Sequence, residues 1–433
     1  MKLMVLMLAL PLTLVAQEPA DTGARPIRLD EAVRLAENNA PAAVQARGEV
    51  RTSQAQVRSA FASFIPNVSL NASTSRQGGD RFDPSGQLVP FTGNAWQFNH
   101  GLALNVDLFD GGQRLFNVRS TRAQVDAATS SEVAQRYNVA LQVKQQFFAV
   151  LAAREAEAAA QSQLEEAQQQ LSTSVAKLHA KTATRSDSLR SVIQVGNAQL
   201  ALLSAVNDRN TADATLTRLV GTPFPVTASP ADTVQEAMIQ IDSGNVASLA
   251  VDGPLVRAAL SSEVAAHASS RAARAPYLPT LSLSWNISGN RSDESMGGLA
   301  GQYAYQHSLR LGLSYPLFNQ LGREEGIVRA DVAERNAEAS VRDARLLAEQ
   351  NLVQYLGALR TAQAQVTIQT ATVDAAEEDL RVQKQRYDLG ASVLLDVLTS
   401  ETALVQARAA LIQARYDYRV AKAQLEALIG RDL

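Results

Sequence analysis

The 433-residue sequence contains no cysteine, and only 5% of its residues are aromatic. Without cysteine the chain has no disulfide, no thiolate nucleophile, no cysteine metal ligand and no site for an N-terminal lipid anchor. The net charge of −3 gives no electrostatic basis for binding nucleic acid. The four histidines, His100, His179, His267 and His307, show no metal-binding or nucleophile–base spacing. We therefore expect no catalytic, cofactor or metal site, and no enzyme.

The sequence also lacks an apolar run of the ~20 residues that a membrane-spanning helix needs. The N-terminal run from Met4 to Leu14 is shorter, follows Lys2 and ends near the small residue Ala16. This order is typical of a secretory signal peptide, so we expect cleavage after Ala16 and export of the remainder. A membrane anchor is the alternative, and the short run disfavours it.

What the sequence does contain is one long unit written twice. FIPNVSL at Phe64–Leu70 corresponds to YLPTLSL at Tyr277–Leu283, 213 positions later. DLFD around Phe109 and RLVG ending at Gly221 recur 209 positions later as PLFN and ALIG. The pattern indicates a tandem duplication of one large unit and not a short-period solenoid.

Each copy carries two segments in which apolar and polar residues alternate: 68–73 and 96–108 in the first copy, 281–288 and 303–315 in the second. Period-two alternation predicts strands with one apolar and one polar face. Their length suits membrane-spanning strands, although a half-buried sheet in a soluble protein is the alternative. Aromatic residues in these segments suggest a membrane girdle: Trp96, Phe98, Trp285, Tyr303, Tyr305 and Tyr315.

The rest of each copy has apolar residues at every seventh position. The row is clearest near the C-terminus, at Val397, Leu404, Leu411, Tyr418 and Leu425. A sustained heptad repeat of apolar residues predicts helices that pack as coiled coils. A helix over residues 113–180 would be roughly 100 Å long at 1.5 Å per residue, which no globular core requires.

Four strands cannot close a barrel, and an open sheet edge cannot face lipid because its backbone groups would go unpaired. The chain must therefore oligomerise to span a membrane. Two chains would supply eight strands, and side chains would fill the interior of such a barrel. Three chains would supply twelve strands, which can surround an open lumen. The strand number leaves both possibilities open.

The duplicated plan of two strands followed by a long helical hairpin resembles the TolC-like outer membrane efflux proteins. So do IRLDEAVRLAENNAP at Ile27–Pro41 and YDLGASVLLDVLTSE at Tyr387–Glu401, which is near the family's Y-x-x-G-x-x-x-x-x-D-V-L pattern. The resemblance implies a mainly α fold with a membrane β-barrel, in which a homotrimer forms a 12-stranded barrel in the outer membrane. A periplasmic α-helical barrel would continue it.

The resemblance also implies a function and partners. The protein would be the passive exit duct of a tripartite efflux or type I secretion system, located in outer membrane lipid and extending into the periplasm. A periplasmic adaptor (membrane fusion protein) and an inner-membrane pump of the resistance-nodulation-division, ABC or major facilitator type would feed it. A periplasmic coiled-coil scaffold would explain the sevens but not the strands, and a substrate-specific porin the strands but not the helices.

This plan divides the chain into seven parts. They are the signal peptide (1–16), an N-terminal tail and equatorial helix (17–63), the first strand pair (64–110), the first long helical hairpin (111–221), an equatorial linker with helices (222–275), the second strand pair (276–319) and the second hairpin (320–430). Thr222–Asp232 is rich in Pro and Thr and is typical of a linker.

The glycine turn in the second hairpin would be its periplasmic tip. Gly390 suits the left-handed end of one helix, and Ser392 can cap the next. Asp396 and its first-copy counterpart Asp187 would form a ring of carboxylates in the trimer, complement helix dipoles, or do both. By resemblance, Tyr387 joins both aspartates at the periplasmic aperture.

The resemblance also makes the second tip an adaptor-docking surface. By resemblance, Gly390 and Ala391 belong to this surface. We expect Val393, Leu394 and Leu395 to be exposed beside them as part of it, because uncovered apolar groups usually await a partner. The first tip departs from this pattern, since Lys181 stands where Gly390 stands in the second. Ser392 and Thr399 occupy the positions of an arginine and an aspartate that lock the aperture in some members.

Overall fold

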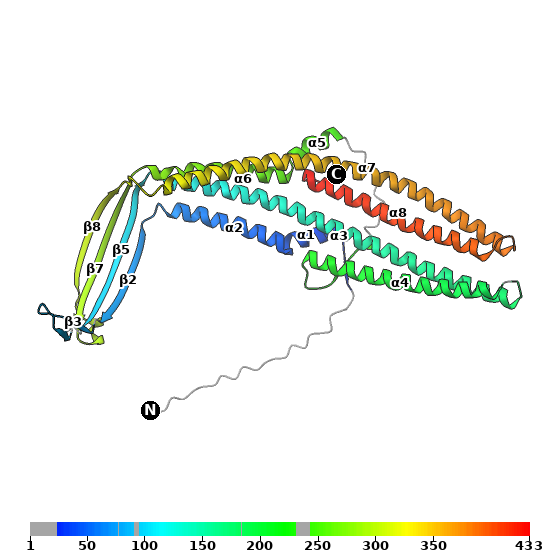
Figure 1. The fold of residues 1–433 in the computed structure, drawn as a ribbon, viewed down its shortest axis with the longest axis horizontal. Helices are drawn as coiled ribbons and strands as arrows, with labels where there is room; N and C mark the ends of the chain where they lie inside the picture. Colours follow the sequence, from blue (N-terminus) through cyan, green and yellow to red (C-terminus); the bar gives the residue numbers. More distant parts are fainter. Residues whose placement is uncertain (1–23, 77, 91–94, 183, 231–242) are drawn as a thin grey trace, which may run out of the picture. The chain divides into compact units, whose positions relative to one another are not determined.

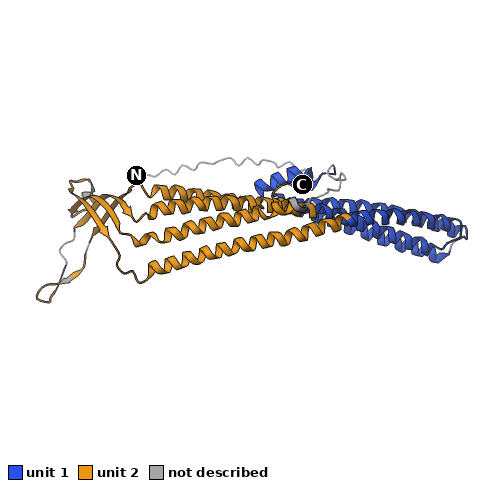
Figure 2. Cartoon of the chain, turned by 90° about the horizontal axis from the view of Figure 1, so that it is seen from above, with its two compact units in different colours: residues 1–40, 142–237, 364–420 blue, residues 41–141, 238–363, 421–433 orange. Residues whose placement is uncertain are grey.

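The computed structural model describes residues 24–76, 78–90, 95–182, 184–230 and 243–433. The expected signal peptide lies outside the described residues. The described chain divides into two compact units, coloured blue and orange in Figure 2. One unit contains residues 1–40, 142–237 and 364–420, and the other contains residues 41–141, 238–363 and 421–433.

The alternating segments form one antiparallel sheet of four strands: β2 (Asn67–Arg76), β5 (Trp96–Asp110), β7 (Thr280–Asp293) and β8 (Ala304–Ser314). The strand order is β2-β5-β7-β8, so β5 of the first copy pairs with β7 of the second (Figure 1). The register shifts between Asp107 and Phe109, where a β-bulge interrupts the pairing of β5 with β7. Strands β2 and β8 each have a neighbour on one side only.

The predicted helices form two hairpins of equal size. Helices α3 (Gln113–His179) and α7 (Gly322–Asp388) have 67 residues each, and α4 (Arg185–Val220) and α8 (Leu394–Ile429) have 36 each. Each helix of the second copy begins 209 positions after its counterpart, as the sequence repeat requires. Across the part of the chain that the structure describes, every helix is too short or too polar to cross a membrane.

The blue unit contains a small parallel sheet that the sequence did not suggest. Strand β1 (Arg25–Ile27) pairs with β6 (Val226–Ala228), which lies inside the predicted linker. Val226 and Ala228 are fully buried, and Arg154 Nη1 donates to the Ala228 carbonyl oxygen at 2.6 Å. This segment is a strand because its backbone partner, β1, lies far from it in the sequence, near the N-terminus. Helix α1 (Leu29–Asn39) follows β1.

The orange unit contains the four-stranded sheet and several shorter elements. These are α2 (Pro41–Ala62), the β3–β4 hairpin (Asp80–Phe82 and Leu88–Pro90), α5 (Ser243–Val251), α6 (Pro254–Ala273), and the 3-10 helices η2 (Ala275–Tyr277) and η3 (Met296–Ala300). A small core joins Val256 of α6 to Ala344 and Ala348 of α7. Alanine at this contact lets the two helices approach closely.

Candidate functional site at the hairpin tips

The second tip is a left-handed turn at Gly390. Helix α7 ends at Asp388, and Gly390 has φ 74°. The Ala391 N–H donates to the Arg386 carbonyl at 2.8 Å, which is the six-to-one hydrogen bond of a Schellman motif. Nothing lies within 4 Å of the position that a Cβ at Gly390 would occupy. Glycine is therefore favoured by backbone conformation and not by crowding.

The first tip adopts the same backbone without a glycine. Lys181 has φ 59°, and the Thr182 N–H donates to the Lys177 carbonyl at 2.9 Å. A non-glycine residue in this conformation costs about 1 kcal/mol or more. The two copies therefore form equivalent turns, and the substitution of lysine for glycine changes the surface and the strain rather than the path of the chain.

Asp187 forms a capping box with Thr184, the N-cap residue of the helix that follows the first tip. The Asp187 N–H donates to Thr184 Oγ1 at 3.2 Å, and the Thr184 N–H donates to Asp187 Oδ2 at 3.0 Å. This reciprocal pair is a capping box, which satisfies two otherwise unpaired N–H groups at the start of α4. One of the two roles that the sequence suggested for Asp187, at a helix N-terminus, is thus present in the geometry.

Asp396 holds the corresponding position in α8. Helix α8 begins at Leu394, and the Val393 N–H donates to Asp396 Oδ2 at 3.4 Å. Ser392 was expected to cap the helix, but its hydroxyl instead donates to the same Asp396 oxygen at 2.7 Å. The carboxylate of Asp396 therefore serves the first turn, and Ser392 supports the carboxylate.

A lysine that the sequence did not single out joins the two hairpins. Lys177, in the last turn of α3, places its Nζ 2.9 Å from Asp388 Oδ1 at the end of α7. The same ammonium group lies 3.9 Å from the centre of the Tyr387 ring. Burial raises the pKa of the Tyr387 hydroxyl, while the Lys177 charge opposes that shift. Basic residues are common in the last turn of a helix because they interact favourably with the helix dipole. The position of Lys177 in the sequence therefore did not point to this contact.

The apolar groups at the second tip divide into exposed and buried side chains. Val393 is 61% exposed and Leu395 is 53% exposed. The expectation that Leu394 is exposed with them is wrong, because its side chain is only 1% exposed. Leu394 begins α8 and points inward, as the helical spacing between neighbouring residues requires.

The sheet has one polar and one apolar face. A representative polar row across the four strands is Asn71, Gly101, Ser288 and Gln306. The apolar face is open, with Leu70 78% exposed. Such an exposed apolar surface needs a partner or a lipid environment.

The proposed girdle residues occupy different levels of the sheet. Trp96 and Phe98 lie at the start of β5. Tyr303 directly precedes β8 and Tyr305 lies near its start, at the same end of the sheet, with β7 between β5 and β8. Tyr315 directly follows β8 at the other end. Trp285 pairs with Leu104 and Leu309, so it lies within the apolar band rather than at its edge. Gly289 of β7 lies between His100 of β5 and Tyr305 of β8. Because glycine has no side chain, His100 Nε2 and the Tyr305 hydroxyl can form a hydrogen bond of 3.2 Å across it.

A family model described as "Outer membrane efflux protein" matches residues 32–222 and 247–431. The chain belongs to the outer membrane efflux protein family. Membership identifies it as an outer membrane protein that acts in efflux or secretion, within a family of channels rather than enzymes. The two matched ranges coincide closely with the two copies of the sequence repeat.

Curated relatives of this efflux family agree with that assignment. The pyoverdine export outer membrane protein OpmQ of Pseudomonas putida is 27% identical over 391 residues, which cover 88% of this chain and 81% of OpmQ. The outer membrane efflux protein BepC of Brucella suis is 26% identical over 402 residues, covering 92% and 84%. CyaE of Bordetella pertussis is 27% identical, covering 88% and 79%.

Solved structures support the fold of this family member. The outer membrane protein VceC from Vibrio cholerae superposes with a TM-score of 0.72 at 19% identity, over 93% of this chain and 96% of VceC. A membrane protein from Pseudomonas aeruginosa gives 0.75 at 20% identity, over 98% and 97%. The fold thus extends over nearly the whole chain at low sequence identity.

Proposed function

We propose that the protein is the exit duct of a tripartite efflux or type I secretion system and that it works as a homotrimer with a 12-stranded β-barrel. It carries no chemistry of its own and provides a water-filled path through the outer membrane and periplasm. The observation that carries this proposal is the four-stranded sheet, which has one exposed apolar face and two unshared edges, β2 and β8.

The edges determine the need for partners. In lipid, an unpaired strand edge leaves N–H and C=O groups unsatisfied at a cost of several kcal/mol each. Pairing β8 of one chain with β2 of the next chain leaves no unpaired strand edge once the ring of chains closes. Three chains supply twelve strands, which can surround an open lumen. Two chains would supply eight strands, and side chains would fill the interior of such a barrel.

The apolar face of the sheet also favours the duct over the alternative of a periplasmic scaffold. Leu70, Leu309 and Leu313 are largely exposed on that face. A water-soluble scaffold would have to cover them, whereas a barrel presents them to lipid. We therefore place the sheet in outer membrane lipid, with the aromatic residues of the strand ends near its boundaries and the helical hairpins in the periplasm.

The hairpin tips would form the periplasmic aperture. In a trimer, Asp187 and Asp396 contribute six carboxylates near the turns, and Tyr387 lies beside them. Such a ring favours cations. Its carboxylates would retain their capping hydrogen bonds, because a carboxylate has more acceptor positions than these bonds use.

The second tip would dock the periplasmic adaptor. Gly390, Ala391, Val393 and Leu395 form the proposed contact, and the buried Leu394 supports it from beneath. The adaptor would connect the duct to an inner-membrane pump of the resistance-nodulation-division, ABC or major facilitator type. The substrate would then be chosen by the pump, and the export of pyoverdine named for the relative OpmQ is one example of such a cargo.

The test is the native mass of protein extracted from outer membranes in a mild detergent. A mass of three chains, with release only by detergent, is the expected result. A single chain, or release by salt or alkali alone, would contradict the shared barrel and favour the scaffold. A mass of two chains would contradict the open twelve-stranded lumen.

A further inference from the structure

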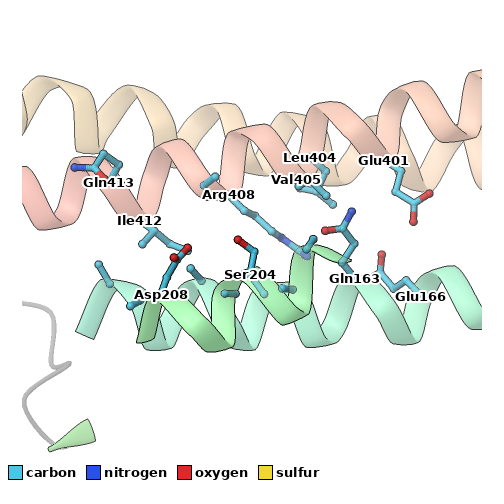
Figure 3. Close-up of a pocket in the computed structure, with 18 residues that line it drawn as sticks. Gln163, Glu166, Ser204, Asp208, Glu401, Leu404, Val405, Arg408, Ile412 and Gln413 are labelled. Carbon is cyan, nitrogen blue, oxygen red and sulfur yellow. The ribbon is translucent and has the colours of Figure 1, made fainter. Parts of the chain in front are cut away.

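The blue unit contains a cavity between α3, α4 and α8 (Figure 3). Its volume is about 570 Å³, within the range of small-molecule sites. Alanines such as Ala153, Ala160 and Ala205 form much of its wall, together with Leu404 and Ile412. Small side chains on three neighbouring helices leave this space open, and its wall is mainly apolar.

The charged groups in this wall are mostly acidic. Glu166 of α3, Asp208 of α4 and Glu401 of α8 all line the cavity, and Arg408 is the single basic residue in its lining. The Arg408 guanidinium donates to Glu377 at 2.9 Å, a carboxylate that is not part of the lining. Arg408 is therefore already paired, and the cavity has an excess of negative charge.

Glu401 is the acidic group that most needs a partner. Its side chain is 3% exposed, and its carboxylate makes no hydrogen bond or ion pair with any residue in the described ranges. Burial raises the pKa of Glu401; Lys384 lowers it and Glu166 raises it further. Buried polar groups are normally paired, since desolvating an unpaired charge is costly. Figure 3 places Glu401 and Glu166 at the same end of the cavity, on facing helices.

Packing alone does not require an acid at this position. Glu401 follows the buried Leu394 by seven residues, so it occupies a core position of α8 where a coiled coil favours apolar residues. In the first copy the corresponding residue is Val192, which is 52% exposed. The carboxylate is therefore specific to the second copy, where the position is buried.

We propose that this cavity binds small organic cations that carry an apolar body. The positive group would lie between Glu401 and Glu166 and supply the charge that Glu401 lacks. The apolar body would lie along the alanine wall toward Leu404 and Ile412, replacing water at an apolar surface. The site lies on the helices away from the tips, its lining residues all come from one chain, and the proposal does not rest on the duct function.

The experiment is a fluorescence titration of the full chain in nanodiscs of zwitterionic lipid at pH 8, with ethidium as the probe. Ethidium is a flat aromatic monocation, and 6-phenylphenanthridine is its uncharged parent ring. We expect saturable binding of ethidium at one site per chain and much weaker binding of the neutral ring. Glu401→Gln and Glu166→Gln should each weaken ethidium binding at least about tenfold, because the attraction between a carboxylate and the positive ring system is lost.

The matched control is Glu349→Gln, which removes the same charge from an exposed position of α7 outside the cavity. It should leave the affinity for ethidium unchanged. Absence of saturable binding would overturn the proposal, and so would unchanged affinity in both cavity variants or equal weakening by the control. Equal affinity for the neutral ring would show that the carboxylates do not select a cation. Glu166→Gln, at a half-buried position, keeps the test valid if Glu401→Gln fails to fold.

Discussion

Lys177 Nζ lies 2.9 Å from the carboxylate of Asp388 and thereby ties the end of α3 to the end of α7. The ion pair connects the two copies of the repeat at their tips, where only short turns follow. Lys177 is about one-quarter exposed and Asp388 about two-thirds. At such exposure the pair contributes up to about 1 kcal/mol to stability. We therefore expect its main effect on the position of the tips rather than on folding.

Replacing Lys177 with methionine should loosen the tips and leave the fold intact. The variant loses the ion pair and the contact of the ammonium group with the Tyr387 ring. The expected result is a higher single-channel conductance in planar bilayers. Lys181→Met is the matched control, because Lys181 is exposed at the same tip and its side chain makes no such contact in the described chain. Equal conductance of wild type and Lys177→Met would contradict a closing role for this pair.

Substitutions at Asp187 and Asp396 can separate the carboxylate ring from helix capping. The Asp187→Asn, Asp396→Asn double variant removes the charges but keeps a side-chain oxygen that can accept from the first-turn N–H groups. We expect reduced cation selectivity with nearly unchanged thermal stability. The alanine double variant should also lose about 1 kcal/mol per helix. The measurement is the reversal potential in a KCl gradient, and unchanged selectivity in the asparagine variant would leave only the capping role.

Gly390→Val should weaken adaptor coupling while the trimer still assembles. Valine is β-branched and strongly disfavours the left-handed conformation at φ 74°, at a cost of about 1–3 kcal/mol. The turn would shift and displace the exposed Val393 and Leu395. Drug sensitivity of cells and crosslinking to the adaptor measure the coupling, and native mass measures assembly. Lys181→Gly is a useful comparison, because it should relieve strain at the equivalent turn. Loss of the trimer in Gly390→Val would refute the docking role.

The stability of the blue unit should depend on pH through Glu401. Its folded-state pKa is raised, so the native state takes up a proton more readily than the unfolded state. The free energy of unfolding therefore increases as pH falls through the raised pKa. Neighbouring charges are Glu166 on α3, Asp208 on α4, and Lys384 and the Glu377–Arg408 pair between α7 and α8.

Glu401→Gln should accordingly stabilise the protein at pH 8, on the order of 1 kcal/mol, and the gain should shrink as pH falls and vanish near pH 4, below the ordinary pKa of glutamate. Thermal melts followed by circular dichroism at both pH values provide the measurement. A destabilised Gln variant at pH 8 would mean that the ionised carboxylate has a stabilising partner in the assembled protein.

Patterns of short range in the sequence predicted most of the fold. Alternation at Val68–Leu70 and at Leu281–Leu283 predicted strands, because successive side chains of a strand point to opposite faces, which is a property of neighbouring residues. The sevens at Val397 and Leu404 predicted the α8 core for the same reason. The duplication predicted equal hairpins, and the glycine turn was predicted from the conformational freedom of Gly390.

The sequence by itself thus determined the repeated plan, the four strands, the two long hairpins and the tip turns, since these depend on periodicity and on local backbone preference. Only the tertiary structure decided which distant groups meet. It paired β1 with β6, buried Leu394, brought Lys177 to Asp388 and placed Glu401 opposite Glu166. Leu394, Glu401 and Arg408 also follow one another at intervals of seven residues. Whether these side chains are buried depends on the helices that pack over them. Contacts between separate helices depend on how far each is rotated and shifted along its neighbour, and that geometry is set by the packing of the whole unit.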